Sequence, residues 1–265
     1  MKSVITESPA EIKGTRDLII LGCGPSHVEC KYDVETWGVN GVFTLNPKRL
    51  DKLFMSDEES EVDACMFDLP KMVEVCTELD TQMVLPLPYK KLVQTGLPIE
   101  VFPIKRCLQK FNTHFYCNSI AYMLAYALLY TQSVQGPHDL MPRVIKGYKK
   151  IYFYGIDMMT HSTYYQEKGG IEYWMGIAMG MGVEIVNTRS SATGKCWNGR
   201  MYGHFGLTEE ELLKEQLYAP MELIRVSKAS DPQDEWVFDP ATQEYKFSPT
   251  YRKAGEEADR SRVKV

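Results

Sequence analysis

The stretch Asp17-Leu18-Ile19-Ile20-Leu21-Gly22-Cys23-Gly24-Pro25-Ser26 decides the fold class of this chain. Its apolar half, Leu18–Leu21, is typical of a strand that is buried on both faces of a sheet. The glycines then permit a tight turn, and a proline suits the first turn of a helix, whose free N–H groups attract anions. The stretch therefore predicts a strand, a turn and a helix start around a phosphate-sized site. Its candidate binding residues are Gly22, Gly24, Pro25 and Ser26.

Two known glycine signatures match this turn only in part. The dinucleotide fingerprint has a third glycine, for close helix packing, where this chain has His27. Loops of S-adenosylmethionine-dependent methyltransferases have an acidic residue before the first glycine and end in glycine, where this chain has Ile20 and Ser26. A strand-to-helix turn without any ligand is the remaining alternative, since two glycines in a short span are a weak signal alone.

The composition is that of a globular protein with a large core: 265 residues, 44% hydrophobic and 25% charged. The net formal charge of −5 excludes a broadly basic nucleic-acid surface and leaves only a local basic patch. Seven cysteines without a C-x-x-C pair or zinc-like spacing indicate free thiols in a reducing cytosol. Met1–Gly14 lacks the apolar core of a signal peptide, and no apolar run reaches the ~20 residues of a membrane span. We therefore expect a cytoplasmic protein without a metal or a membrane partner.

Strand and helix patterns alternate over residues 1–190, which predicts a Rossmann-like three-layer α/β/α domain with a mostly parallel sheet. The predicted strands are Leu18–Leu21, Thr36–Asn40, Lys52–Met55, Gln82–Leu87, Ile99–Ile104, Lys149–Asp157 and Gly182–Asn187. The predicted helices are a short one from Pro25, one over Val62–Cys76 interrupted near Pro70, and two buried ones at Asn118–Tyr130 and Ile171–Met181. Tyr89-Lys90-Lys91 and residues 131–142 are predicted loops. For the C-terminal extension, 191–265, we expect a helix at Thr208–Leu217 and an extended or partly disordered tail.

Polar residues follow several predicted strands at their carboxyl ends, where a doubly wound sheet binds its ligands. Asn40 is placed to hydrogen-bond a sugar or a base, although asparagine is equally common in turns. Ser56 and Asp57 close the third strand. Asp57 either faces a ligand or metal, or belongs with the following acidic run to a solvated helix entrance. Ser119, at the predicted start of a buried helix, offers a hydroxyl to an anionic ligand.

Three stretches together resemble a known group, the bacterial CMP-sialic acid sialyltransferases and the related family that includes archaeal 6-hydroxymethylpterin pyrophosphokinases and many phage proteins. They are LIILGCGPS (Leu18–Ser26), NSIAYMLAY (Asn118–Tyr126) and GYKKIYFYGID (Gly147–Asp157), the last followed by Tyr164-Tyr165. The resemblance spans about residues 17–190. It implies a Rossmann-type glycosyltransferase that needs no metal and no tightly bound cofactor, with a nucleotide sugar as substrate.

The resemblance also implies roles for single residues. The glycine turn would line the phosphate or ribose, Asn40 the nucleotide, and Ser119 the donor. Tyr165 falls where the sialyltransferases use a tyrosine hydroxyl to assist the departing phosphate, because a phenol can donate to the charge that develops there. Half-buried packing is the alternative for Tyr165.

Departures from the family fall on its catalytic residues. The lid that carries the histidine base is missing, because Gln166–Gly170 runs directly into the next helix, and Met159 replaces a second tyrosine. His161 lies in the right loop to act as base, since an unperturbed histidine titrates near pH ~6.5. Asp157 and Glu167 are the other candidates, and Asp157 is equally suited to hold the turn. We therefore do not expect sialic acid itself as the donor.

Three functions compete at this stage. The first is a glycosyltransferase whose acceptor is a hydroxyl on a glycan or on a hydroxymethylated base of phage DNA, in which case it acts in the host cytoplasm. The second is a pyrophosphokinase that uses ATP and magnesium, with Asp57, Glu58 and Asp157 as candidate ligands. The third is a nucleotide-binding protein without catalysis. A homo-oligomer is compatible with each of them.

Overall fold

The computed structural model describes residues 5–6, 14–57, 68–137, 139–158, 163–188, 191–194, 234–239 and 244–249. The chain divides into two compact units, Met1–Lys195 and Cys196–Val265, which we describe separately. All site predictions fall in the first unit. In the second, β10 (Asp234–Asp239) and β11 (Glu244–Pro249) form an antiparallel hairpin where the sequence predicts an extended tail.

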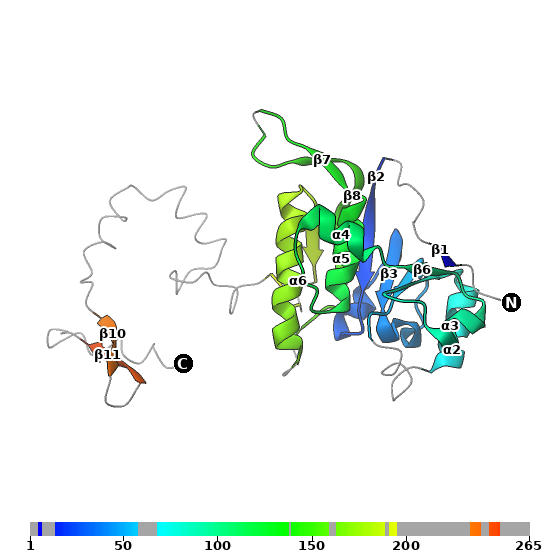
Figure 1. The fold of residues 1–265 in the computed structure, drawn as a ribbon, viewed down its shortest axis with the longest axis horizontal. Helices are drawn as coiled ribbons and strands as arrows, with labels where there is room; N and C mark the ends of the chain where they lie inside the picture. The colour runs from blue at the N-terminus through cyan, green and yellow to red at the C-terminus, as the bar shows by residue number, and fades with distance from the viewer. Residues whose placement is uncertain are drawn as a thin grey trace. The chain divides into compact units, whose positions relative to one another are not determined.

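A mostly parallel sheet forms the centre of the first unit (Figure 1). Its strand order is β1-β6-β5-β4-β3-β2-β8-β7, and β9 also pairs with β8. Among the described strands of this sheet, only β7 and β8 pair antiparallel. The strands are β1 (Ile5–Thr6), β2 (Thr15–Leu21), β3 (Glu35–Val39), β4 (Lys52–Phe54), β5 (Gln82–Leu85), β6 (Ile99–Val101), β7 (Gln132–Val134), β8 (Arg143–Tyr154) and β9 (Glu184–Asn187). The chain has the predicted Rossmann-like α/β fold.

Helices cover both faces of this sheet because the strand order reverses once. From β2 the chain adds β3, β4, β5 and β6 in one direction, then returns past β2 to β8 and β9. Right-handed crossovers place the connections of the two halves on opposite faces. One set comprises the 3₁₀ helices η1 (Pro25–Glu29) and η2 (Asn40–Leu45), α2 (Leu69–Glu78) and α3 (Lys90–Thr95); the other comprises α4 (Ile104–Phe111), α5 (Ser119–Leu129) and α6 (Thr163–Gly180). The reversal between β2 and β8 is the switch point at which such sheets bind ligands.

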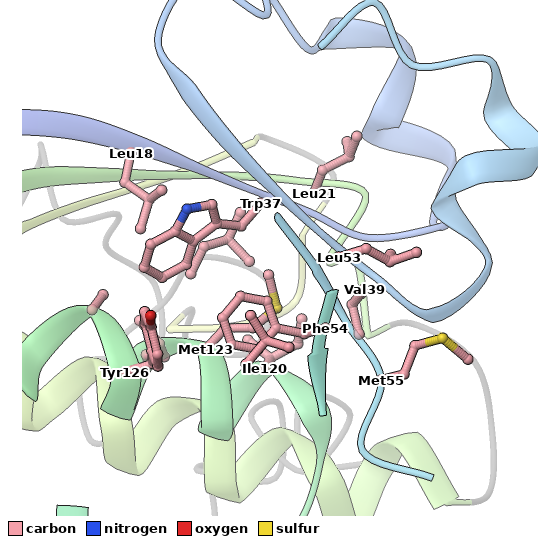
Figure 2. Packing of buried hydrophobic residues seen from close by; sticks show 14 of the residues in the cluster. Leu18, Leu21, Trp37, Val39, Leu53, Phe54, Met55, Ile120, Met123 and Tyr126 are labelled. Atoms are coloured by element: carbon pink, nitrogen blue, oxygen red, sulfur yellow. The ribbon is translucent and has the colours of Figure 1, made fainter. Parts of the chain in front are cut away.

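The core packs α5 against the central strands. Leu18–Leu21 are fully buried, as predicted. Figure 2 shows Met123 and Tyr126 of α5 directed toward Trp37 and Phe54 of the sheet. The ring of Tyr126 meets those of Trp37 and Phe54 edge-on, with centroids 5.3 and 5.5 Å apart. Asn118 caps α5 by accepting the N–H of Ala121 at 2.8 Å, which confirms the predicted buried helix and its start.

Buried polar groups from distant segments meet beneath this sheet. Glu100 on β6 is fully buried and accepts hydrogen bonds from Lys52 of β4 at 3.1 Å and from the hydroxyl of Tyr126 at 2.5 Å. Lys52 also donates to Gln82 at the start of β5. This cluster ties β4, β5, β6 and α5 together, and each charged member has a partner.

Several local predictions are wrong. Pro70 lies in the first turn of α2, where a missing N–H is harmless, and Asp68 caps that turn, while the part of the predicted helix before Asp68 lies outside the described residues. Tyr89-Lys90-Lys91 is not a polar loop, since Tyr89 is buried and α3 begins at Lys90. The predicted loop 131–142 contains β7, and the predicted strand Ile99–Ile104 ends early, at Val101, before α4 begins at Ile104. The helix predicted from Ile171 begins at Thr163. Thr208–Leu217 and residues 58–67 lie outside the described residues.

Within the described part of the chain, every helix is too short or too polar to cross a membrane. The cysteines that the structure describes are free thiols.

Candidate functional site

The turns that follow β2 and β8 interlock at the switch point. The N–H of Gly22 donates to the carbonyl of Tyr154 at 2.8 Å, and the N–H of Gly24 donates to the carbonyl of Gly155 at 2.7 Å. In return, the N–H of Gly155 donates to the hydroxyl of Ser26 at 2.8 Å. We call the two interlocked turns, Gly22–Ser26 and Gly155–Asp157, the clasp.

Only glycine fits at three positions of the clasp. A Cβ on Gly22 would lie 2.4 Å from the carbonyl oxygen of Gly155. Gly155 has a left-handed φ of +66°, and its Cβ would lie 2.1 Å from the carbonyl oxygen of Gly22. A Cβ on Gly24 would lie 2.4 Å from a carboxylate oxygen of Asp157. The glycines of the opening stretch are therefore required by contact with a second turn, more than 130 residues further along the chain.

Asp157 holds the clasp from the side of β8. Its buried carboxylate accepts the N–H of Ser26 at 2.9 Å, and its carbonyl accepts the N–H of Ala192 at 2.8 Å. The N–H groups of Gly24 and Ser26 thus already bond within the protein, and Pro25, which is exposed, has none. The geometry gives Gly24, Ser26 and Asp157 a structural role in joining the two turns. Contact of the Gly22–Ser26 turn with a phosphate stays a prediction.

Asn40 lies at the carboxyl end of β3, beside the clasp. Burial raises the pKa of the Cys23 thiol in the turn after β2, and a hydrogen bond from the backbone of Gly41 acts in the opposite direction. This hydrogen bond brings the turn into contact with Gly41, the residue after Asn40. The side-chain oxygen of Asn40 is buried and has no hydrogen-bond partner within the described part of the chain. Leaving such an acceptor unpaired costs about 1–3 kcal/mol, so it requires an explanation.

Two residues with side chains have left-handed backbone angles at the same edge of the sheet. Asn40 and Met158, which follows Asp157, both have φ of +49°. A residue with a side chain in this left-handed region costs ~1–3 kcal/mol, and such residues cluster at active sites and ligand clamps. Met158 is the less expected of the two, because asparagine tolerates this region and methionine does not.

A second polar group lies where β4 ends and the helices α5 and α6 begin. The side chain of Asn118 donates to the carbonyl of Glu167 at 2.9 Å, and the hydroxyl of Tyr89 donates to the carbonyl of Asp57. Ser119 is buried in the first turn of α5, and Ser56 is half-buried at the end of β4. Burial, and then the nearby carboxylate of Asp57, raise the pKa of Glu167 above its ordinary value.

This raised pKa predicts a stability effect at neutral pH. The folded state holds the Glu167 proton more tightly than the unfolded state, so stability falls as the pH rises from the unfolded to the folded pKa. We expect Glu167→Gln to be more stable than the parent at pH 7. Below pH ~4 the two proteins should be equally stable, because protonated Glu167 is then as neutral as the glutamine that replaces it. Urea unfolding at both pH values measures this. Glu172→Gln is the control in the same helix: Glu172 accepts the N–H of Gly194 at 2.8 Å and pairs with Lys168, so no gain is expected. A gain for Glu172→Gln alone would contradict the assignment.

The side chains of three predicted site residues lie outside the described part of the chain. His161 and Glu58 lie outside the described residues. The backbone of Tyr165 belongs to the first turn of α6, and its side chain lies outside the described part. Among the described residues, no group of three or more His, Cys, Asp or Glu side chains is arranged to hold a metal.

The sequence reasoning missed the segment that closes over the clasp from the end of β9. The hydroxyl of Ser191 donates to the carbonyl of Ile156 at 2.8 Å, and the buried Thr193 lies 2.7 Å from the same hydroxyl. Short polar residues after a strand are common in loops, so no sequence signal distinguished these two.

Comparison with protein-family models, with curated proteins and with solved structures finds no match to this chain. Fold and site geometry therefore carry the functional argument.

Proposed function

We propose that this protein binds a nucleotide-activated sugar at the carboxyl edge of its sheet and transfers the sugar to a hydroxyl acceptor, either on a glycan or on a hydroxymethylated DNA base. One observation carries the proposal: a buried, unpartnered acceptor on Asn40 lies beside the clasp at the switch point of a Rossmann-like sheet. A ribose hydroxyl or an exocyclic amine of the base is a donor that would satisfy this oxygen.

Transfer of the sugar needs a general base and a group that assists departure of the nucleotide phosphate. The acceptor hydroxyl attacks the anomeric carbon, the bond from that carbon to the phosphate oxygen breaks, and the base takes the hydroxyl proton. Among the residues that the structure describes, Glu167 is the candidate for this base, because a raised pKa makes a carboxylate a better proton acceptor. His161 remains the candidate that the sequence suggests, with Tyr165 donating to the leaving phosphate.

The test is nucleotide release from a panel of CMP-, UDP-, GDP- and dTDP-sugars, with and without glycan and hydroxymethylated DNA acceptors. We expect Asn40→Ala to weaken donor binding by about tenfold, in line with one lost hydrogen bond in a buried site. Asn46→Ala is the matched control, because Asn46 has a similar φ of +51° but is exposed beyond η2. If none of the donors released its nucleotide, the proposal would be wrong.

The close carboxylates of Asp57 and Glu167 favour one alternative, an ATP-dependent pyrophosphokinase. Carboxylate oxygens suit magnesium, and these two residues would hold it next to the phosphates. Nucleotide binding that is equally tight with EDTA and with magnesium would count against this alternative. Tight binding without any turnover would instead indicate the third candidate, a non-catalytic nucleotide binder.

A further inference from the structure

Two aromatic side chains form an exposed corner beside α6. Phe115, in the segment between α4 and α5, is 46% exposed, and Tyr173 of α6 is 41% exposed. Their ring centroids lie 5.4 Å apart, and the planes of the rings meet at 85°. We call this pair the aromatic corner. Each ring packs against the other and still leaves a large part of its surface to solvent.

The aromatic corner is fixed from behind by a buried tryptophan. The indole N–H of Trp174, whose side chain is fully buried, donates to the carbonyl of Phe115 at 2.8 Å. The N–H of Phe115 donates to the hydroxyl of Thr113 at 3.2 Å. The ring of Trp174 also meets that of Tyr173 edge-on, with centroids 5.9 Å apart. The two exposed rings are thus preorganised, so a ligand would lose little binding energy in ordering them.

Glycines keep the surface around Tyr173 open. Gly169 and Gly176 lie four residues before and three residues after Tyr173, which places all three on one face of the helix. A Cβ at either glycine would meet nothing within 4 Å, so no contact within the described part of the chain requires glycine there. Glycine destabilises a helix relative to alanine. A ligand that lies close against α6 beside Tyr173 gives these two glycines a reason.

The aromatic corner is connected to the candidate base. Phe115 packs on Tyr173, and three residues after Phe115 the side chain of Asn118 donates to the carbonyl of Glu167 at 2.9 Å. The chain from Phe115 to Asn118 therefore contacts α6 first at Tyr173 and then at Glu167. Six residues of helix rise ~9 Å, so the corner lies within the length of a short oligosaccharide from the turn that carries Glu167.

The charges beside the aromatic corner favour a neutral ligand. Lys110 and Lys168 are the lysines closest in sequence to its two rings. Lys110 donates to three backbone carbonyls at and just beyond the end of α5, and Lys168 lies 3.4 Å from Glu172. Single-stranded nucleic acid also stacks on aromatic rings, but it needs a positively charged groove along its backbone. With both lysines engaged in a chain of net charge −5, a neutral ring is the better fit.

The size of the aromatic corner suits a small ligand. A whole aromatic side chain buries about 150–250 Å², so the exposed 46% and 41% of these two offer about 130–220 Å² together. A stable protein interface buries ~800 Å² on each side, which is several times more. A small ring therefore fits the corner better than a second copy of this chain.

We propose that the aromatic corner binds a pyranose ring of a neutral glycan, and so selects the glycan from the two acceptors of the proposed function. A pyranose has an apolar face of C–H groups, which packs on the negative face of an aromatic ring. Its hydroxyl groups stay in water at the rim, which suits rings that are only half exposed. The inference rests on the proposed function only in making this glycan the acceptor, since binding of the carbohydrate itself needs no donor.

The test is saturation-transfer NMR of the full chain with a panel of neutral oligosaccharides that includes lactose, maltotriose, cellotriose and chitotriose, without any nucleotide. We expect binding through the C–H protons of the sugar, and binding at least tenfold weaker in Phe115→Ala and in Tyr173→Ala. Gly169→Leu should weaken binding as well, because its side chain would fill the space beside Tyr173, while leucine favours the helix. Met179→Ala is the matched control, since Met179 is 52% exposed on the same helix outside the corner. Circular dichroism confirms that each variant is folded.

Binding of no oligosaccharide in the panel, or equal binding by the parent and the two alanine variants of the corner, would overturn the inference. So would an oligonucleotide with hydroxymethylated bases that loses affinity in those variants, because the corner would then belong to DNA. Light scattering tests the remaining occupant: a change from dimer to monomer in Tyr173→Ala would make the corner an interface between copies of this chain. If a glycan binds at the corner but no donor releases its nucleotide, the proposed transfer is wrong and the carbohydrate site stands.

Discussion

Gly155→Ala is expected to lower the free energy of unfolding by ~3 kcal/mol or more, which removes a large part of the stability of a typical domain. Two effects add. The left-handed φ of +66° disfavours any side chain by ~1–2 kcal/mol, and the new Cβ would lie 2.1 Å from the backbone oxygen of Gly22. Since that neighbour is backbone, relief requires the strands β2 and β8 to separate at their carboxyl ends. Urea unfolding followed by circular dichroism measures the loss.

Gly176→Ala is the matched control for this prediction. Gly176 lies in α6, and a Cβ there would meet nothing within 4 Å. Because glycine is a poor helix former, the change should stabilise the protein by ~0.5–1 kcal/mol. If Gly155→Ala were as stable as the parent while Gly176→Ala behaved as expected, the interlocked turns would not be the structure that joins β2 to β8.

Glu100→Ala is expected to cost ~3–5 kcal/mol, because it leaves the largely buried ammonium of Lys52 without its carboxylate. The side chain of Glu100 is 0% exposed, and the hydroxyl of Tyr126 would lose its acceptor as well. Replacing both charges, in Lys52→Met/Glu100→Met, should restore much of the loss, since well-packed apolar residues often equal a buried ion pair. Thermal and urea unfolding of the parent and of these two variants give the comparison.

The control for the ion pair is Glu74→Ala. Lys71 and Glu74 form a pair of similar length, 3.0 Å, but their side chains are 38% and 55% exposed. Exposed pairs contribute ~0–1 kcal/mol. A cost for Glu100→Ala no greater than that for Glu74→Ala would contradict the buried cluster.

The fold was predictable because its evidence is local. Four buried branched residues followed by two glycines gave β2 and its turn, and Asn118 marked the start of α5. The missed elements are those whose burial depends on distant residues. Tyr89 reads as part of a polar loop beside two lysines, yet its burial and its bond to Asp57 support α3.

The candidate site was predictable only in its position. Glycines and Asn40 at strand ends indicate the ligand edge of a parallel sheet from sequence alone. The pairing of Asp157 with the N–H of Ser26 joins residues 131 apart, and no local pattern encodes it. Glu100 was hidden for the same reason, since its partners Lys52 and Tyr126 lie 48 and 26 residues away.

The proposed function requires a nucleotide to bind at the carboxyl edge of the sheet, beside the clasp and Asn40. Hydrogen exchange with and without CMP, UDP, GDP or ATP tests this binding, because a ligand slows opening of the segments that it contacts. We expect slower exchange in peptides covering residues 22–31, 39–46 and 155–158, and no change around Thr15 and Arg16, which lie at the amino end of β2 on the opposite edge of the sheet. Protection confined to that opposite edge, or absent with all four nucleotides, would contradict it.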